Sequence, residues 1–225
     1  MNFLFLSIVP EDSSAKLIFF ISIGAIVLLI AVLGILSAQK KISDTRMLAN
    51  ASVALAASYA LSFFKFEMAF GGSITPASFV PVIIFSYAYG PAKGLFVGLV
   101  YSLLQFIQQP WIVHPIQVIC DYPLAFASIA LAGIFKGKTK STLSAVLLGT
   151  LCVGAARLVM HTIAGMYFWE AGSVIANITT NNALVYSLIY NLMYVPLDIV
   201  ICMAALFYLV KSRVFDTLIT NMRPK

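Results

Sequence analysis

The sequence predicts an all-α polytopic membrane protein with seven transmembrane helices. Of its 225 residues, 61% are hydrophobic and only 10% are charged, and a soluble domain of this size has too little interior to bury that much apolar surface. The apolar runs are continuous over about 16 to 25 residues, as bilayer-spanning helices require, whereas barrel strands alternate over roughly ten. Because lipid offers the backbone no hydrogen-bond partners, helices are the remaining choice.

Seven apolar runs define the predicted spans. The first, residues 15–38, follows Glu11 and Asp12, where a signal peptide would carry Lys or Arg, and a polar Gln39-Lys40-Lys41 segment ends it. We therefore expect it to be retained as a helix. The other six cover residues 48–64, 74–89, 95–108, 116–135, 143–169 and 183–210. The chain divides into an N-terminal helix with a basic linker and a six-helix domain with a basic tail, at residues 1–47 and 48–225.

The basic residues predict how these spans are oriented. Eleven of the fourteen Lys and Arg residues fall on one side of the membrane, and the positive-inside rule assigns that side to the cytoplasm. The N-terminus is then outside and the C-terminus inside, and the net charge of +6 reflects topology rather than nucleic-acid binding. The eleven residues are Lys40, Lys41, Arg46, Lys93, Lys136, Lys138, Lys140, Lys211, Arg213, Arg223 and Lys225.

A polar pair near the outer end of the fifth span is the strongest indication of a site. Gln117 and Asp121 are four residues apart, so a helix presents both on one face. A carboxylate at membrane depth is costly and marks a functional site by default. The alternative is that Asp121 is only satisfied by a backbone amide or by Arg157.

Further aromatic and polar residues are expected at the same outer face. Together they suit a flat, nitrogen-rich cationic molecule, because rings stack on aromatic side chains and a carboxylate or π face holds the cation. The alternative for the Trp and Tyr residues is an interfacial aromatic belt. The residues are Trp111, His114 and Tyr122 near Asp121; Arg157, His161 and Trp169; Tyr186, Tyr190, Asn191 and Tyr194; and the 71–73 loop.

The sequence gives no support for an enzyme, a cofactor or a metal site. It contains no His-Glu-x-x-His, Gly-x-Ser-x-Gly or ATP-binding Gly-x-x-x-x-Gly-Lys-Ser/Thr motif. His114, His161 and Asp121 lack zinc-ligand spacing. The three cysteines lie at unrelated spacings inside apolar runs and fit no disulfide framework. The basic loops are too small to read nucleic acid.

Six short motifs occur in order between residues 48 and 212. They are Gly-Gly-Ser-Ile-Thr (71–75), Tyr-Gly-Pro-Ala-Lys-Gly (89–94), Ile-Val-His-Pro-Ile-Gln (112–117), Asp-Tyr-Pro-Leu-Ala-Phe (121–126), His-Thr-Ile-Ala-Gly-Met-Tyr-Phe-Trp (161–169) and Val-Tyr-Ser-Leu-Ile-Tyr-Asn (185–191). This region resembles the thiamine-specific substrate-binding subunit, or S component, of energy-coupling factor (ECF) transporters, the ThiT/YuaJ-type family.

The resemblance implies a six-helix, non-enzymatic subunit that captures thiamine in the cytoplasmic membrane of a prokaryote. Such a subunit docks on a transmembrane coupling subunit that carries two ATP-binding subunits, and the helix at 15–38 lies outside its six-helix core. By position, Asp121 would be the acidic ligand of the pyrimidine region, with Tyr122 beside it. Trp169 would stack on the vitamin and His161 would be its neighbour. Hydrogen bonds would come from Tyr186 and Asn191, and Trp111 would be a lid aromatic; Gln117 and His114 complete the predicted site.

The chain departs from the family pattern at three places. Asp121 stands where the best-known pattern has Glu, so its carboxylate is one methylene further back. Gly72 is the nearest residue to a Trp that the first outer loop contributes in that pattern. Asn50 replaces an expected Ala before Ala54 in the small-residue docking motif. We expect the subunit to dock on the coupling subunit through Asn50, Ser52, Ala54 and Ala56, because small residues four apart let two helices approach closely. The alternative is that these residues pack against other helices of the same chain.

Two other functions remain open at this point. One is capture of a thiamine precursor such as a hydroxymethylpyrimidine by a subunit of the same fold. The other is an intramembrane enzyme or a purely structural assembly subunit.

Overall fold

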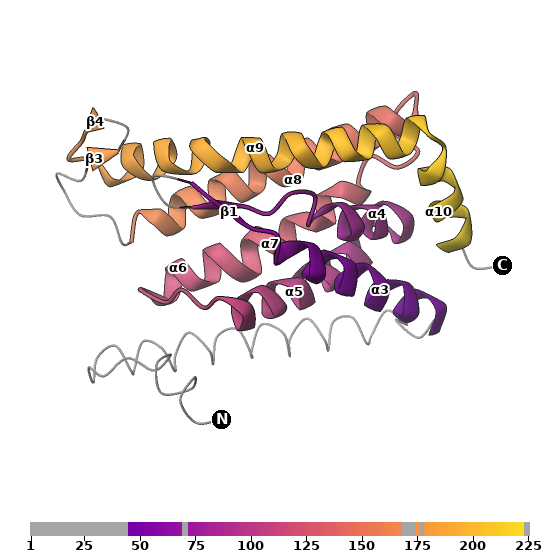
Figure 1. The fold of residues 1–225 in the computed structure, drawn as a ribbon, viewed down its shortest axis with the longest axis horizontal. Coiled ribbons are helices and arrows are strands. Elements are labelled where there is room, and N and C mark those ends of the chain that lie inside the picture. The colour runs from indigo at the N-terminus through magenta and orange to yellow at the C-terminus, as the bar shows by residue number, and fades with distance from the viewer. Residues whose placement is uncertain (1–44, 69–71, 168–173, 176–177, 223–225) are drawn as a thin grey trace.

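The computed structural model describes residues 45–68, 72–167, 174–175 and 178–222. The described part is mostly helical, as predicted, and its long helices run along one common axis (Figure 1). The helices are α3 (Thr45–Ser62), α4 (Val80–Tyr89), α5 (Pro91–Gln108), α6 (Pro115–Ile119), α7 (Ala125–Ala127), α8 (Thr142–Gly165), α9 (Ala183–Lys211) and α10 (Val214–Met222), with a π-helical turn η1 (Cys120–Leu124) and a 3₁₀ segment η2 (Ser128–Gly133).

Three continuous helical stretches in the described residues are long and apolar enough to cross a membrane. They are Pro115–Gly133, Thr142–Gly165 and Ala183–Lys211, and they coincide with the last three predicted spans. Helices α3 and α5 lie at the second and fourth predicted spans. The predicted span at 15–38 lies outside the described residues.

The predicted third span is wrong in extent. Helix α4 begins at Val80 and has ten residues, which is about 15 Å of helix, whereas Ser73–Ile74 forms strand β2. Pro81 lies in the first turn of α4, where its missing N–H costs nothing. Ala77 adopts a positive φ of 60° just before the helix, which interrupts any helical path from β2.

The fifth span is not a regular helix but a chain of four short pieces. Pro123 cannot donate the usual hydrogen bond to Ile119 and its ring would clash with that carbonyl. The backbone widens into η1 instead, and the N–H of Ala125 reaches the carbonyl of Cys120 five residues back. Such π turns often occur at functional sites, and this one contains Asp121.

Close helix packing holds this irregular span in place. A Cβ at Gly98 of α5 would lie 2.3 Å from the carbonyl oxygen of Phe126, so only glycine permits the observed contact between α5 and α7. Helices α8 and α9 pack along one another, and a Cβ at Gly154 of α8 would lie 2.6 Å from Ile199 of α9. The site residues on these helices are therefore held on closely packed backbones.

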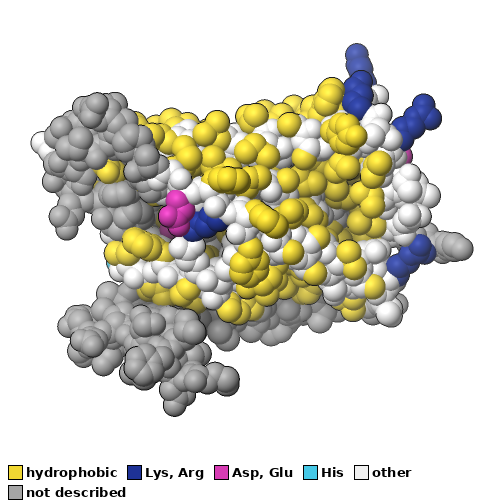
Figure 2. Space-filling view, in the orientation of Figure 1, with side chains coloured by type: hydrophobic (Ala, Val, Ile, Leu, Met, Phe, Trp, Pro, Cys, Tyr) yellow, Lys and Arg dark blue, Asp and Glu magenta, His cyan; other side chains and the backbone are white. Residues whose placement is uncertain are grey.

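Helix α10 closes one end of the bundle, where the sequence suggested only a basic tail. The hydroxyl of Tyr89 donates to the carbonyl of Met222 at 2.6 Å and accepts from Asn50 Nδ2 at 2.8 Å. Arg46 donates to the carbonyl of Asn221 at 2.7 Å. These bonds join the start of α3 and the end of α4 to α10. Figure 2 shows Lys and Arg side chains at this end of the molecule and apolar side chains over the middle of the visible face.

Two short antiparallel hairpins were not predicted. One pairs β1 (Phe66–Glu67) with β2 (Ser73–Ile74), and the other pairs β3 (Val174–Ile175) with β4 (Ile178–Thr179). Hairpin β3–β4 lies at the end of the bundle remote from α10, and β1 lies alongside the bundle, in the half remote from α10 (Figure 1). Hairpin β1–β2 contributes Glu67 and Ser73 to the cavity described next.

Candidate functional site

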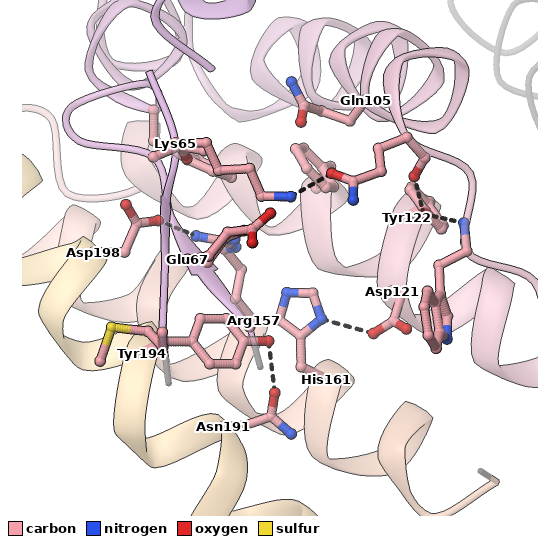
Figure 3. A pocket seen from close by; sticks show the side chains of 18 of the residues that line it. Lys65, Glu67, Gln105, Asp121, Tyr122, Arg157, His161, Asn191, Tyr194 and Asp198 are labelled. Carbon is pink, nitrogen blue, oxygen red and sulfur yellow. Dashed lines mark hydrogen bonds and ion pairs between the residues drawn. The ribbon is translucent and has the colours of Figure 1, made fainter. Parts of the chain in front are cut away.

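A cavity of about 800 Å³ lies among α5, η1, α8, α9 and hairpin β1–β2. Its lining combines charged side chains with aromatic rings, and Figure 3 shows the polar groups turned toward one another across it. The charged residues that line it are Lys65, Glu67, Asp121, Arg157 and Asp198; the rings are Phe79, Tyr101, Trp111, Tyr122, Phe126, His161, Tyr190 and Tyr194.

Asp121 joins the fifth span to helix α8. Its Oδ1 lies 2.7 Å from Nδ1 of His161, and its Oδ2 accepts from Nε2 of Gln117 at 2.7 Å. Gln117 is fully buried and is itself held by the backbone, since it donates to the carbonyl of Trp111 and accepts from the N–H of Val113, both at 3.1 Å. The predicted alternative partner of Asp121, Arg157, pairs elsewhere.

Arg157 forms an ion pair with Asp198 of α9. Nη1 of Arg157 lies 3.0 Å from Oδ2 of Asp198, and both side chains are buried. The guanidinium also lies over the ring of Phe79, 3.9 Å from the ring centroid. Phe79 stacks on Phe126, and Tyr101 meets both rings edge-on. This wall of the cavity is therefore an aromatic cluster around a neutralised cation.

Helix α9 contributes a hydrogen-bonded chain. Asn191 donates to the carbonyl and hydroxyl of Ser187, and its side-chain oxygen accepts from the hydroxyl of Tyr194 at 2.7 Å. The ring of Tyr194 packs against Gly72, where a Cβ would lie only 2.8 Å away. Gly72 also has a φ of 71°, so both sterics and backbone conformation require glycine at this position.

The rim of the cavity is built from the connection between α5 and α6 and from the residues after α3. The hydroxyl of Tyr122 donates to the carbonyl of Gln109 at 2.8 Å and accepts from the N–H of Trp111 at 2.9 Å. Trp111 is 59% exposed. Lys65 donates to the side-chain oxygen of Gln109, and a Lys and an acidic side chain are visible together on the surface in Figure 2.

The structure brings most of the predicted site residues together. Asp121, Tyr122, His161, Asn191 and Trp111 line the cavity, and Gln117 supports Asp121 from behind. Trp169 lies outside the described residues.

Three residues of the predicted site, Gln117, His114 and Tyr186, are not part of the described lining of the cavity. His114 caps helix α6, accepting from the N–H of Ile116, and stacks on Tyr167 with ring centroids 4.7 Å apart. Tyr186 is buried in α9, four residues before Tyr190, which does line the cavity. Because Nδ1 of His114 accepts the hydrogen bond that caps α6, this ring nitrogen is already occupied within the protein.

Asp198, Lys65 and Glu67 line the cavity although the sequence reasoning did not select them. Asp198 could have been found, because it is a carboxylate inside the seventh predicted span and the argument used for Asp121 applies to it equally. Lys65 and Glu67 gave no comparable signal, since charged residues in a connecting loop are ordinarily solvated.

The predicted docking face is only partly on the surface. Ser52 and Ala56 are exposed on α3, whereas Ala54 is buried in the core at 4% exposure and Asn50 is turned toward Tyr89. Ala54 is therefore a packing residue. Ala60 is exposed and continues the four-residue spacing of Ser52 and Ala56.

The fold and cavity define a helical membrane protein with an internal cavity lined by charged side chains and aromatic rings. The chain belongs to the thiamine transporter protein (Thia_YuaJ) family, whose pattern it matches over residues 48–216. This confirms the family resemblance drawn from the sequence.

Individual relatives agree with this assignment. The chain is 34% identical over 146 residues to the thiamine transporter ThiT of Bacillus subtilis, covering 59% of this chain and 71% of that protein. It is 27% identical over 125 residues to the thiamine transporter ThiT of Lacticaseibacillus paracasei, covering 50% and 60%. The fold matches a ThiT structure from Listeria monocytogenes with a TM-score of 0.63 at 24% identity, over 75% of this chain and 96% of that one. These relatives are named as transporters, in agreement with the prediction that the chain is not an enzyme.

Proposed function

We propose that the protein is the substrate-capture subunit of an ECF-type importer and binds thiamine in the cavity around Asp121 and His161. The observation that carries this proposal is the charge of the described lining. Three carboxylates, Glu67, Asp121 and Asp198, face two cations, Lys65 and Arg157. Counted over Asp, Glu, Lys and Arg, the described lining has one excess negative charge, which favours a cationic ligand.

The aromatic lining supports the same substrate. Thiamine joins an amino-substituted pyrimidine to a cationic thiazolium ring, and the cavity offers flat aromatic faces with hydrogen-bonding groups among them. A cation over an aromatic ring and a ring stacked on another ring are both favourable. Tyr194, Tyr190 and Trp111 are the rings that we propose for these contacts, together with Trp169 and the hydrogen-bonding groups of Tyr122 and Asn191.

Thiamine titration tests this function. Purified protein should change its Trp fluorescence on addition of thiamine, and Asp121→Asn should weaken binding by about 1.5–3 kcal/mol because a charged hydrogen-bond acceptor is lost. Val200→Ala, on an exposed part of α9, is the control and should bind as the wild type does. A hydroxymethylpyrimidine competitor should bind poorly if the cation is recognised; equal competition would favour a precursor as the substrate.

We further propose that the subunit docks on a coupling subunit with two ATP-binding subunits. Seven spans with the N-terminus outside and the C-terminus in the cytoplasm would put the cavity at the outer face of the cytoplasmic membrane. The basic residues near α10 support this orientation by the positive-inside rule. The domain division at residue 47 is part of the same proposal.

The exposed small residues of α3 are the proposed docking face. Ser52, Ala56 and Ala60 follow one another at intervals of four, which permits close helix contact in lipid. Ala56→Trp should abolish co-purification with the coupling subunit and leave thiamine binding intact. Val200→Trp on α9 is the matched control. Docking that survives Ala56→Trp would remove this face from the proposal, and loss of thiamine binding as well would indicate misfolding.

A further inference from the structure

The buried hydrogen-bond network behind Asp121 fixes which atoms donate. The N–H of Val113 can only donate and the carbonyl of Trp111 can only accept, and both contact the side chain of Gln117. The amide oxygen of Gln117 therefore faces Val113, and its nitrogen faces Trp111 and Asp121. Oδ2 of Asp121 must then accept, as an oxygen of an ionised carboxylate does.

An ionised Asp121 would set the tautomer of His161. Oδ1 of an ionised carboxylate can only accept, and Nδ1 of His161 would then carry the proton in their 2.7 Å contact. In a neutral imidazole with Nδ1 protonated, Nε2 is an acceptor. Figure 3 shows the carboxylate of Asp121 directed at the imidazole of His161.

Nε2 of His161 has no hydrogen-bond partner in this network. It is buried and has no hydrogen-bond partner among the described residues, although His161 lines the cavity. A buried polar atom without a partner costs free energy and calls for an explanation. Both oxygens of Asp121, by contrast, already have partners within the protein.

We propose that Asp121 is a positioning residue and that Nε2 of His161 is the atom that accepts a hydrogen bond from the substrate. The complementary group is an N–H donor on a heteroaromatic ring, such as the amino group of the thiamine pyrimidine. The proposal rests on the thiamine function above and changes the role that family resemblance gives to Asp121. The shorter Asp side chain sets the carboxylate back, where it holds His161.

This arrangement also suits a cationic substrate. With a neutral imidazole, the negative charge of Asp121 is not cancelled, and the substrate encounters both an acceptor and a nearby anion. An imidazolium would donate from Nε2 and cancel that charge. Nε2 of His161 thus accepts from an N–H group on a heteroaromatic ring, and the negative charge of Asp121 nearby favours a substrate that also carries a positive charge.

Nitrogen-15 NMR of the full-length protein tests the proposal directly. The chain has two histidines, so selective labelling gives two imidazole signals, and His114→Gln assigns them. At a mildly alkaline pH, His161 should have a protonated Nδ1 and an unprotonated Nε2 without ligand. Thiamine should then shift Nε2 in the direction of an accepted hydrogen bond. A protonated Nε2 in the ligand-free protein, or an Nε2 signal unchanged by bound thiamine, would overturn it.

A double-mutant cycle separates positioning from direct contact. Asp121→Asn should weaken thiamine binding by about tenfold or more in the wild-type background. In a His161→Ala background, the same substitution should change the remaining affinity by less than about twofold. An equal loss in both backgrounds would mean that Asp121 contacts the substrate itself. Wild-type protein that binds no thiamine would refute the proposed function, while the ligand-free tautomer would still decide the arrangement of the pair.

Discussion

Arg157 on α8 and Asp198 on α9 form a buried ion pair, with 3.0 Å between Nη1 and Oδ2, in the wall of the cavity. The pair joins two helices that pack along one another. Removing one partner leaves an uncompensated charge in a region of low polarity, which costs far more than removing both.

We therefore predict that Asp198→Leu destabilises the protein by about 3–5 kcal/mol. The double variant Arg157→Met, Asp198→Leu should recover most of that loss, because neither charge remains. Unfolding by denaturant in detergent measures both. Equal losses for the single and double variants would show that the charges contribute little and that packing dominates.

Gly72 should be needed for substrate binding. Gly72→Ala forces a methyl group against the ring of Tyr194, where the Cβ would lie 2.8 Å away, and should weaken thiamine binding by displacing that ring. Gly137→Ala is a matched control, because Gly137 has a similar φ of 73° with nothing within 4 Å. Both substitutions incur about 1–2 kcal/mol of backbone strain. Equal binding by the two variants would contradict the role of the Tyr194 contact.

Gln117 should contribute to both stability and affinity. Gln117→Met keeps the volume but leaves the Val113 N–H and the Trp111 carbonyl without their side-chain partner. Each lost bond costs about 1–3 kcal/mol when the groups stay buried, and Asp121 loses a donor as well. Calorimetric titration with thiamine and a thermal melt should both show a loss. An unchanged affinity would show that Asp121 holds its position without Gln117.

The hydroxyl of Tyr89 should hold α10 in place. Tyr89→Phe removes the bonds to Met222 and Asn50, and we expect faster hydrogen exchange across Val214–Met222 with about 1–2 kcal/mol less stability. Thiamine binding should be unchanged, since Tyr89 is not among the described residues that line the cavity. Tyr208→Phe, at an exposed position on α9, is the control. Exchange that stays slow would mean that the buried Phe215 suffices to hold α10.

The sequence predicts helices well here because long apolar runs leave few other structures in lipid. It also identifies Gln117 and Asp121 as partners, because a spacing of four residues places both on one helix face. The start of α4 was missed because the predicted span began at Ile74, although the segment 73–79 contains Ser73, Thr75, Pro76 and Ser78 and is more polar than the helix that follows. The π turn at Pro123 was likewise missed, because periodicity assumes a regular helix.

Which face of a helix points inward is harder to predict in a membrane protein. Lipid and protein interior are both apolar, so hydrophobicity does not distinguish Ala54, which is buried, from Ala56, which is exposed. The same limit applies across helices. Asp121 pairs with His161 and Arg157 with Asp198 because of how α8 and α9 are rotated, and no local spacing encodes that rotation.

The π turn at Pro123 has a consequence for how this binding site can evolve. Position 123 sets the rotation of the backbone that carries Asp121, although Pro123 itself is absent from the described lining of the cavity. A change there would turn the carboxylate relative to its neighbours without altering any contacting side chain. Directed-evolution libraries aimed at new ligand preferences should therefore diversify this proline along with the residues that touch the cargo.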